Sequence, residues 1–214
     1  MKIAIDGTAA SGKGTLSNLL SKALKLPNLD TGLLYRKVAF SYIKLTKSTH
    51  LQNTIDNSIL NNILDEFDLT NLDPETLKHD LYGNFASIIG SLDFVRDKLK
   101  ILQIEFVKNM TKKSGGCILD GRDIGTKILP NADFKFYVDA PLEVRAKRRF
   151  EQLYSNDKKI KFEKIMFDLK KRDFSDKSRE NSPLILSKNS ILINTEFLNS
   201  EEVFKKALYY IKKN

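Results

Sequence analysis

Cysteine and histidine are scarce in this sequence, and their scarcity excludes several classes of protein. One cysteine cannot form an intramolecular disulfide, and one cysteine with two histidines leaves no zinc site at finger-like spacing. No apolar run approaches the roughly 20 residues that a membrane helix needs. The first residues break into glycine and serine too early for a signal peptide. The sequence therefore predicts a soluble, cytoplasmic protein.

Glycine and proline are also few, with 10 Gly and 5 Pro among 214 residues, while 41% of the residues are hydrophobic and 29% are charged. This is the composition of a globular protein, and it excludes disordered and fibrous chains. The length suits one α/β domain, with or without a small insert, and is short for two independent enzyme domains. The net charge of +9 favours anionic partners, whether nucleotides, nucleic acid or a lipid surface.

Arginine is much rarer than lysine. Of the 36 basic residues, 8 are arginine and 28 are lysine. A genome that favours lysine codons is one explanation for the excess, but it does not explain where arginine remains. Arginine offers a planar fork of donors that suits phosphate or the edge of a base, so its positions form a provisional map of a binding site. They are Arg36, Arg96, Arg122, Arg145, Arg148, Arg149, Arg172 and Arg179.

Short apolar segments alternate with helical ones along the chain. The strand candidates are residues 2–6, 116–120, 134–139 and 191–194. Apolar residues recur at helical spacing in 15–24, and a helix is expected over 141–154 with its proline at the start. Ser200 is expected to cap a terminal helix whose first turn holds Glu201 and Glu202. Strands that alternate with helices predict an α/β fold with a parallel sheet covered on both faces.

The strongest motif is GTAASGKGT at residues 7–15, which follows an apolar strand and opens a helix. Glycines let backbone N–H groups converge on phosphate oxygens, Lys13 can reach the β- and γ-phosphates, and the Thr15 hydroxyl can face a magnesium ion. Ser or Thr usually follows the lysine directly, whereas here Gly14 intervenes. The alternative is a chance glycine-rich turn, but spacing, strand and helix agree on a phosphate-binding loop.

The sequence GKGT resembles nucleoside monophosphate (NMP) kinases, and further motifs resemble the bacterial cytidylate kinase family. These motifs are LDTGLLYR at 29–36, LDGRDIGT at 119–126, LPNADFKFYVDAPLEVRAKRR at 129–149 and NSEEV at 199–203. The resemblance covers most of the chain apart from the polar stretch 44–81. It implies a single domain with a P-loop NTPase-type sheet. Its expected parts are a core of residues 1–36, 85–149 and 183–214, an NMP-binding insert at about 37–84, and a mobile lid with its flanking helix at about 150–182.

The resemblance also implies an activity, namely phosphorylation of CMP and dCMP to CDP and dCDP. The implied phosphoryl donor is ATP, and the implied metal is Mg²⁺, which Thr15 would contact directly or through water. The expected partners are these small nucleotides alone, with no nucleic acid and no membrane, and the expected state is a monomer. Two alternatives remain open: a kinase of the same architecture that uses UMP or AMP, and a basic P-loop protein that binds nucleic acid without turning nucleotides over. The second lacks a recognisable nucleic-acid module.

The resemblance assigns residues to each part of the reaction. Those implied in catalysis are Lys13, Arg122, Arg172 and Arg179. Those implied in binding the donor nucleotide are Gly7, Thr8, Ala9, Ala10, Ser11, Gly12, Lys13, Gly14, Thr15 and Arg148. Those implied in binding the acceptor nucleotide are Asp30, Thr31, Arg36, Ser87, Arg96, Asp120, Arg122, Asp123, Arg172, Asp176 and Arg179.

Plain structural roles are open to several of these residues. Asp30 and Thr31 could cap a helix, a role that is compatible with binding. Ser87 and Arg96 could form a solvated helix face. The segment 119–126 could be a turn with an internal Arg–Asp pair. Each alternative makes a statement about burial and partners that a structure can test.

Arg172, Asp176 and Arg179 have the spacing i, i+4 and i+7, which places them on one face of a helix. An ion-pair ladder is the alternative, but exposed pairs of this kind contribute only about 0.3–0.5 kcal/mol each. The family usually has another arginine at the position of Ser175. That departure bears on how the segment meets the transferred group.

The helix after Pro141 carries Arg145, Arg148 and Arg149 at i, i+3 and i+4, which crowds like charges on one side. A nearby polyanion would offset their repulsion, so contacts with ATP at the base of the lid are expected. A solvated basic face is the alternative. Cys117 is expected in the core, and the two histidines, His50 and His79, are assigned no role.

Overall fold

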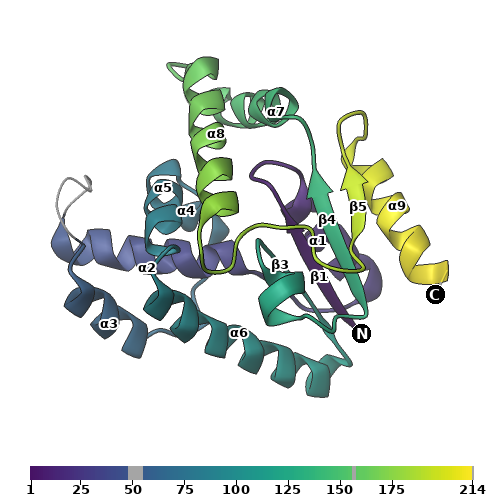
Figure 1. The fold of residues 1–214 in the computed structure, drawn as a ribbon, viewed down its shortest axis with the longest axis horizontal. Helices are drawn as coiled ribbons and strands as arrows, with labels where there is room; N and C mark the ends of the chain where they lie inside the picture. Colours follow the sequence, from purple (N-terminus) through teal and green to yellow (C-terminus); the bar gives the residue numbers. More distant parts are fainter. Residues whose placement is uncertain (48–54, 156–157, 214) are drawn as a thin grey trace. The chain divides into compact units, whose positions relative to one another are not determined.

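The computed structural model describes residues 1–47, 55–155 and 158–213 (Figure 1). His50 and short parts of the expected insert and lid lie outside these described residues. The chain divides into two compact units. Unit 1 consists of Met1–Leu29 and Met110–Asn214, and unit 2 of Asp30–Asn109.

Unit 1 is built on a five-stranded sheet in the order β2-β3-β1-β4-β5. The strands are β1 (Lys2–Gly7), β2 (Asn28–Asp30), β3 (Cys117–Gly121), β4 (Phe134–Asp139) and β5 (Ile191–Asn194). β1 pairs in parallel with β3 and β4, and β4 pairs in parallel with β5. The expected α/β fold with a parallel sheet is confirmed. Sequence analysis missed β2, because a strand of 3 residues shows no readable alternation.

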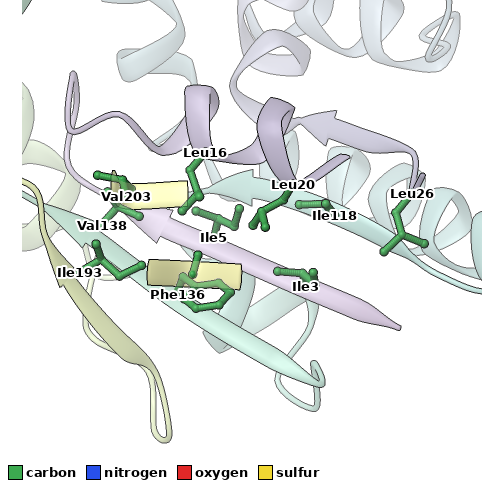
Figure 2. Close-up of a cluster of buried hydrophobic side chains, with 11 residues drawn as sticks. Ile3, Ile5, Leu16, Leu20, Leu26, Ile118, Phe136, Val138, Ile193 and Val203 are labelled. Carbon is green, nitrogen blue, oxygen red and sulfur yellow. The ribbon is translucent and has the colours of Figure 1, made fainter. Parts of the chain in front are cut away.

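The helical elements of unit 1 are α1 (Lys13–Leu24), α7 (Leu142–Tyr154), α8 (Phe162–Ser178), α9 (Ser200–Lys213) and a short π-helical turn, η1 (Ile124–Ile128). Both α1 and α9 cover one face of the sheet. Figure 2 shows Leu16 and Leu20 of α1 directed at Ile5 of β1, and Val203 of α9 beside Val138 of β4. Cys117 is fully buried, as expected.

A second cluster joins α7 and α8 to the phosphate loop. Ala9 of the loop packs with Ala146 of α7 and with Ile165 and Leu169 of α8. The loop that follows β1 therefore shares its hydrophobic contacts with both helices.

Two helix starts differ from the expectation by one residue. Ser200 does not cap α9, because Asn199 Oδ1 accepts the N–H groups of Glu201 and Glu202 at 2.9 and 3.0 Å. The Glu202 carboxylate in turn accepts the Asn199 N–H at 2.8 Å. The two reciprocal contacts form a capping box. Pro141 precedes α7 instead of lying within it.

Unit 2 is helical. Its elements are α2 (Thr31–Thr46), α3 (Asn57–Asp65), α4 (Pro74–Leu77), α5 (Asp80–Ile89) and α6 (Asp93–Ser114), of which α6 ends in unit 1. The polar stretch 44–81 belongs to this unit and has buried side chains of its own, namely Leu60, Ile63, Leu64 and Leu77. Several of its polar residues are helix caps.

Two aspartates show this capping role. Asp56 accepts the N–H groups at the start of α3, and Asp73 does the same for α4. Capping satisfies N–H groups that have no partner inside the helix. Polar composition therefore marked helix boundaries and did not mark an unpacked segment. No described helix is both long and apolar enough to cross a membrane.

Candidate functional site

The loop between β1 and α1 has a backbone suited to phosphate. Gly7 has φ 154°, and a Cβ on it would lie 2.0 Å from the carbonyl oxygen of Val138. Only glycine therefore fits at this position, where β1 pairs with Val138 of β4. Ala10 and Gly12 have φ 59° and 95°. A loop with left-handed residues that leads into a helix N-terminus turns its amide groups towards an anion.

Side chains of the loop stabilise this shape. Ser11 Oγ donates to the carbonyl oxygen of Thr8 at 3.0 Å, and Lys13 Nζ lies 3.5 Å from the same oxygen. Thr8 Oγ1 donates to Asp139 at the end of β4 at 2.5 Å. The loop is thereby tied to the carboxyl end of the sheet, where ligands of open α/β folds bind.

Thr15 and Asp120 are two residues of this region whose side-chain oxygens could serve a magnesium ion. Thr15 is exposed in the first turn of α1, and Asp120 is buried near the carboxyl end of β3. Among the described residues, no group of three or more His, Cys, Asp or Glu side chains could hold a metal ion. Mg²⁺ that is bound mainly by phosphate oxygens and water needs only one or two protein oxygens, so the residues present fit such an ion.

Three arginines converge on Asp176 in α8. Asp176 lies 2.8 Å from Arg122 Nε, 3.9 Å from Arg172 Nε and 3.6 Å from Arg179 Nη1. Burial raises the pKa of Asp176, but the three guanidinium groups outweigh that effect and hold the pKa below its ordinary value. Asp176 is an ionised carboxylate in a cationic cluster.

This cluster excludes two of the plain alternatives. The Asp176 side chain is only 7% exposed, so the contacts are not a ladder of exposed pairs. Arg122 reaches Asp176 from a segment 54 residues away and is therefore not confined to an internal pair within 119–126. The sequence predicted that Arg172, Asp176 and Arg179 share one face of a helix. Arg172 and Asp176 lie in α8 as predicted, whereas Arg179 follows the last residue of α8 and reaches Asp176 from an extended backbone, with φ −65° and ψ 142°.

Arg145 braces the phosphate loop against α8. Its guanidinium donates to the carbonyl oxygens of Ala140 at 2.8 Å and Ala9 at 3.1 Å, and to Asp173 Oδ2 at 2.6 Å. The Arg145 side chain is 5% exposed, and its expected contact with ATP stays a prediction. Because Asp173 follows Arg172 directly, the brace places the arginine cluster beside the phosphate loop.

Arg148 holds the loop that follows β5. It donates to Thr195 Oγ1 at 2.8 Å, to the Thr195 carbonyl oxygen at 2.5 Å and to that of Leu198 at 3.4 Å. Thr195 Oγ1 lies 3.1 Å from the carbonyl oxygen of Ser11. Arg148 therefore acts on the phosphate loop through Thr195, and its assignment to the donor nucleotide stays a prediction.

In unit 2, the segment predicted to bind the acceptor also has structural contacts. Asp30 Oδ1 accepts the Gly32 N–H at 3.1 Å and so caps α2, as the alternative reading proposed. Thr31 is buried in the first turn of the same helix. Arg36 Nη1 donates to the carbonyl oxygens of Leu77 and His79, both at 3.0 Å. These contacts join α2 to the connection between α4 and α5.

Arg96 is not part of a solvated helix face. It is 6% exposed, its Nη1 donates to the Gly90 carbonyl oxygen at 2.9 Å, and its guanidinium lies 5.6 Å from the Tyr35 ring centroid. Ser87 is half-buried in α5. The helix-face alternative is wrong for Arg96, and the role of both residues at a base stays a prediction.

One residue of the site was missed altogether. Asp6 precedes the phosphate loop, is 3% exposed, and accepts two backbone N–H groups from η1. The available signal was a carboxylate at the end of an otherwise apolar strand. Such a group is costly to bury unless it has partners, and its partners are 118 and 119 residues away in sequence.

Comparison with known proteins assigns the family. A family model described as cytidylate kinase matches residues 3–213. The chain belongs to the cytidylate kinase family. A cytidylate kinase of Azorhizobium caulinodans is 39% identical over 213 residues, which cover 100% of this chain and 98% of the relative. A cytidylate kinase of Xanthobacter autotrophicus is 40% identical over 212 residues, which cover 99% and 97%.

Solved structures with lower identity support the fold of this cytidylate kinase family member. An uncharacterised protein from Eubacterium ventriosum has a TM-score of 0.57 at 15% identity and covers 100% of this chain and 99% of its own. A protein from Thermus thermophilus has a TM-score of 0.53 at 18% identity, with coverage of 100% and 96%. At these identities the similarity concerns the fold alone.

In this cytidylate kinase family member, β3 delivers three site residues to the carboxyl end of the sheet. Asp120 lies within β3, and Arg122 and Asp123 follow it directly. Asp120 and Asp123 are 2% and 8% exposed. Burial lowers the pKa of Arg122, but the charges of Asp176 and Asp120 outweigh this and raise it overall, so Arg122 is a permanent cation.

Proposed function

We propose that this chain transfers the γ-phosphoryl group of ATP to CMP and dCMP, forming ADP with CDP or dCDP. The observation that carries the proposal is the cluster of Arg122, Arg172 and Arg179 around Asp176, on a helix that Arg145 braces to the phosphate loop. A loop for the donor phosphates and a dense group of guanidiniums beside it are what transfer between two phosphates requires.

The chemistry consists of positioning and charge stabilisation. The acceptor phosphate is already an anionic nucleophile, so the site needs no general base. The protein has to gather cations around the transferred group and keep water away from it. We assign Lys13 to the donor phosphates, and Arg122, Arg172 and Arg179 to the charge on the transferred and acceptor phosphates. Asp176 orients these three arginines.

A magnesium ion belongs to this proposal. When bound, it neutralises negative charge on the phosphate oxygens. Thr15 would contact it directly or through water, and Asp120 would orient a water in its shell. The remaining residues of the phosphate loop bind the donor through their backbone amides.

The assignment of the acceptor base rests on family resemblance. Asp30, Thr31 and Arg36 are assigned to the acceptor nucleotide, and Ser87 and Arg96 to the cytosine edge. The resemblance also implies a contact of Asp123 with the pyrimidine ring. Adenine has C2–H where cytosine presents the acceptor O2, so it would leave a donor of Arg96 without an acceptor.

A coupled assay of ADP production across nucleoside monophosphates tests the function. We expect CMP and dCMP to be turned over with the highest kcat/KM, and UMP and AMP to be poorer acceptors. Equal turnover of AMP and CMP would contradict the assignment. Retention on DNA without nucleotide turnover would favour the basic P-loop alternative.

A substitution tests the site. Arg122→Ala should lower kcat on the order of a thousandfold, because a cation that stabilises the transferred phosphoryl group is lost. Lys127→Ala is the matched control, since Lys127 is an exposed cation in the same segment and should leave kcat unchanged. Near wild-type turnover by Arg122→Ala, with the fold intact, would remove this residue from the site.

We also assign a moving part to the segment 150–182. Hydrogen exchange in residues 158–175 should slow when ATP analogue and CMP bind together, because closure shields the transferred group from water. Unchanged exchange there would contradict a lid. Ser175→Arg restores the usual family residue and tests whether this position affects kcat. Monomeric state and a cytoplasmic location complete the proposal as expectations.

A further inference from the structure

Asp6 makes an unusual pair of contacts in the interior of unit 1. It lies in β1, next to Gly7, and is 3% exposed. Its Oδ1 accepts the N–H of Ile124 at 2.8 Å, and its Oδ2 accepts the N–H of Gly125 at 2.7 Å. Each carboxylate oxygen therefore holds one backbone amide of the segment that follows β3.

The two amides belong to the start of η1, directly after the site residues Arg122 and Asp123. Within the described structure the Asp123 side chain does not cap this turn, although Asp123 is its N-cap residue. Asp6 takes that role from a different strand. Hydrogen bonds from N–H groups to an ionised carboxylate are shorter and about twice as strong as those between neutral groups. The position of the backbone beside Arg122 is therefore set by Asp6.

Close packing around Gly125 restricts movement of the segment that follows Asp123. A Cβ built on Gly125 would lie 2.7 Å from Ser187 Oγ, 3.2 Å from Asp6 Oδ2 and 3.3 Å from Lys135 Cδ. The segment is held between β1, β4 and the chain that follows α8. A change in the hydrogen bonds of Asp6 therefore affects the two residues before η1, Arg122 and Asp123.

The groups that face Asp6 are of both signs. Asp123 and Arg122 come from the segment after β3, and Tyr137 comes from β4, where it pairs with Asp6. Burial is the largest influence and raises the pKa of Asp6 to about 6, against the two amides, which lower it. The carboxylate therefore changes charge close to the neutral range, where the enzyme is expected to work.

We propose that Asp6 is a positioning residue for phosphoryl transfer, and that its ionised carboxylate sets the place of Arg122 by holding the amides of Ile124 and Gly125. Protonation removes one acceptor and frees the Gly125 or the Ile124 amide, so the Arg122 segment loosens. The inference rests on the assignment of Arg122 to the transferred phosphate made above. It adds a residue that touches neither nucleotide.

Asp6→Asn is the direct test, because the amide keeps the size of the side chain but can accept at only one position. We expect kcat with CMP to fall about tenfold or more, with a smaller change in KM, because small misplacements of catalytic groups are costly. Asp133→Asn is the matched control. Asp133 also accepts a backbone N–H of β1, that of Lys2 at 2.6 Å, but at the amino end of the strand and away from the site. Its kcat should not change.

The pH profile separates positioning from a loss of structure. The acceptor phosphate itself ionises with a pKa of about 6, so every variant loses turnover in acid. In wild type and Asp133→Asn, kcat should fall in acid as two groups take up protons, Asp6 and the acceptor phosphate. In Asp6→Asn only the phosphate remains, so the slope of log kcat against pH should be that of a single ionisation. Equal steepness in all three proteins would overturn the proposal, as would an unchanged kcat in Asp6→Asn.

A measurement on the wild-type protein keeps the test independent of how the variant folds. The amide NMR signals of Ile124 and Gly125 should shift with pH. The midpoint of that shift should match the pH at which kcat falls to half of its maximum. Signals that do not titrate would overturn the proposal. Failure of the proposed function is distinguishable, since the wild type itself would then not turn over CMP. Failure of the Arg122 assignment would show as retained turnover in Arg122→Ala.

Discussion

At the scale of single residues, two glycines of the phosphate-binding motif differ in what the fold requires of them. Gly7 is required by the fold, since a Cβ on it would meet the Val138 carbonyl oxygen at 2.0 Å and its φ is 154°. Gly14 has no described atom within 4 Å of the position where a Cβ would lie. The protein itself therefore leaves space at Gly14.

Replacing each glycine by alanine should separate these reasons. Gly7→Ala should lower the free energy of unfolding by about 3 kcal/mol or more, because it combines a clash with backbone and an unfavourable φ. Gly14→Ala should leave it unchanged or raise it by up to about 1 kcal/mol, because alanine favours a helix over glycine. Urea unfolding checks both values, and equal destabilisation by the two changes would contradict this account.

Asp6 should make stability depend on pH with a defined sign. Its pKa in the folded chain is raised from 3.8 to about 6, so the folded state binds a proton more tightly than the unfolded state. The contribution of Asp6 to stability is fully present below pH 4 and is lost as pH rises to about 6. The shift corresponds to a loss on the order of 3 kcal/mol.

Urea unfolding of wild type and Asp6→Asn across this pH range measures the effect. The advantage of the wild type over the variant should shrink as pH rises from about 4 to about 6. A constant difference between wild type and Asp6→Asn would show that Asp6 does not titrate in the folded chain.

Sequence patterns identified residues with distinctive local spacing and missed those defined by distant partners. The phosphate loop was readable because strand, glycines, lysine and helix are adjacent in sequence. The pairing of Arg172 with Asp176 followed from helical periodicity. The role of Asp6 and the partner Asp173 of Arg145 did not, because these contacts join residues 118 and 28 positions apart and follow only from how the sheet and α8 are placed.

At the scale of elements, the connection between α7, the phosphate loop and α8 depends on one buried side chain. Arg145 satisfies two backbone carbonyl oxygens and the Asp173 carboxylate. One of the like charges on α7, that of Arg145, is thus offset by an aspartate of the protein. The sequence showed the crowding of arginines on this helix but did not show that Asp173 pairs with one of them.

Arg145→Ala should be strongly destabilising. Removing one partner of a buried pair costs about 3–5 kcal/mol, because it leaves the other charge without compensation. Lys147→Ala, an exposed cation on the same helix, should change stability by no more than about 0.5 kcal/mol. Thermal unfolding of both variants checks the contrast. In Arg145→Ala the double change with Asp173→Ala should recover part of the loss, and no recovery would contradict a direct pair.

Element boundaries were predictable where caps follow common rules and not where two caps compete. β4 and β5 have the predicted bounds, because their apolar runs are flanked by polar residues. At α9 both Asn199 and Ser200 are good cap residues, and the choice was settled by the reciprocal contact with Glu202. The helices of unit 2 were hidden because their caps resemble the polar residues of a loop.

At the scale of the whole molecule, the net charge of +9 has a consequence for substrate binding. Both nucleotides are anions, and α8 adds exposed lysines such as Lys170 and Lys171 next to Arg172. Charges of this kind attract an anion over a distance of the Debye length, which is about 8 Å at physiological ionic strength. Cations that are buried with a partner, such as Arg122, are screened much less by salt.

Ionic strength should therefore affect capture of the nucleotides more than the chemical step. Raising it should lower kcat/KM for CMP several-fold while kcat at saturation stays within a factor of about two, because added salt screens exposed charges. The double change Lys170→Gln and Lys171→Gln should flatten the salt dependence of kcat/KM and leave kcat unchanged. A neutral osmolyte at matched viscosity is the control for slower diffusion. If kcat fell with salt as steeply as kcat/KM does, the cations that act on the transferred group would have to be exposed, which conflicts with the 13% exposure of Arg122.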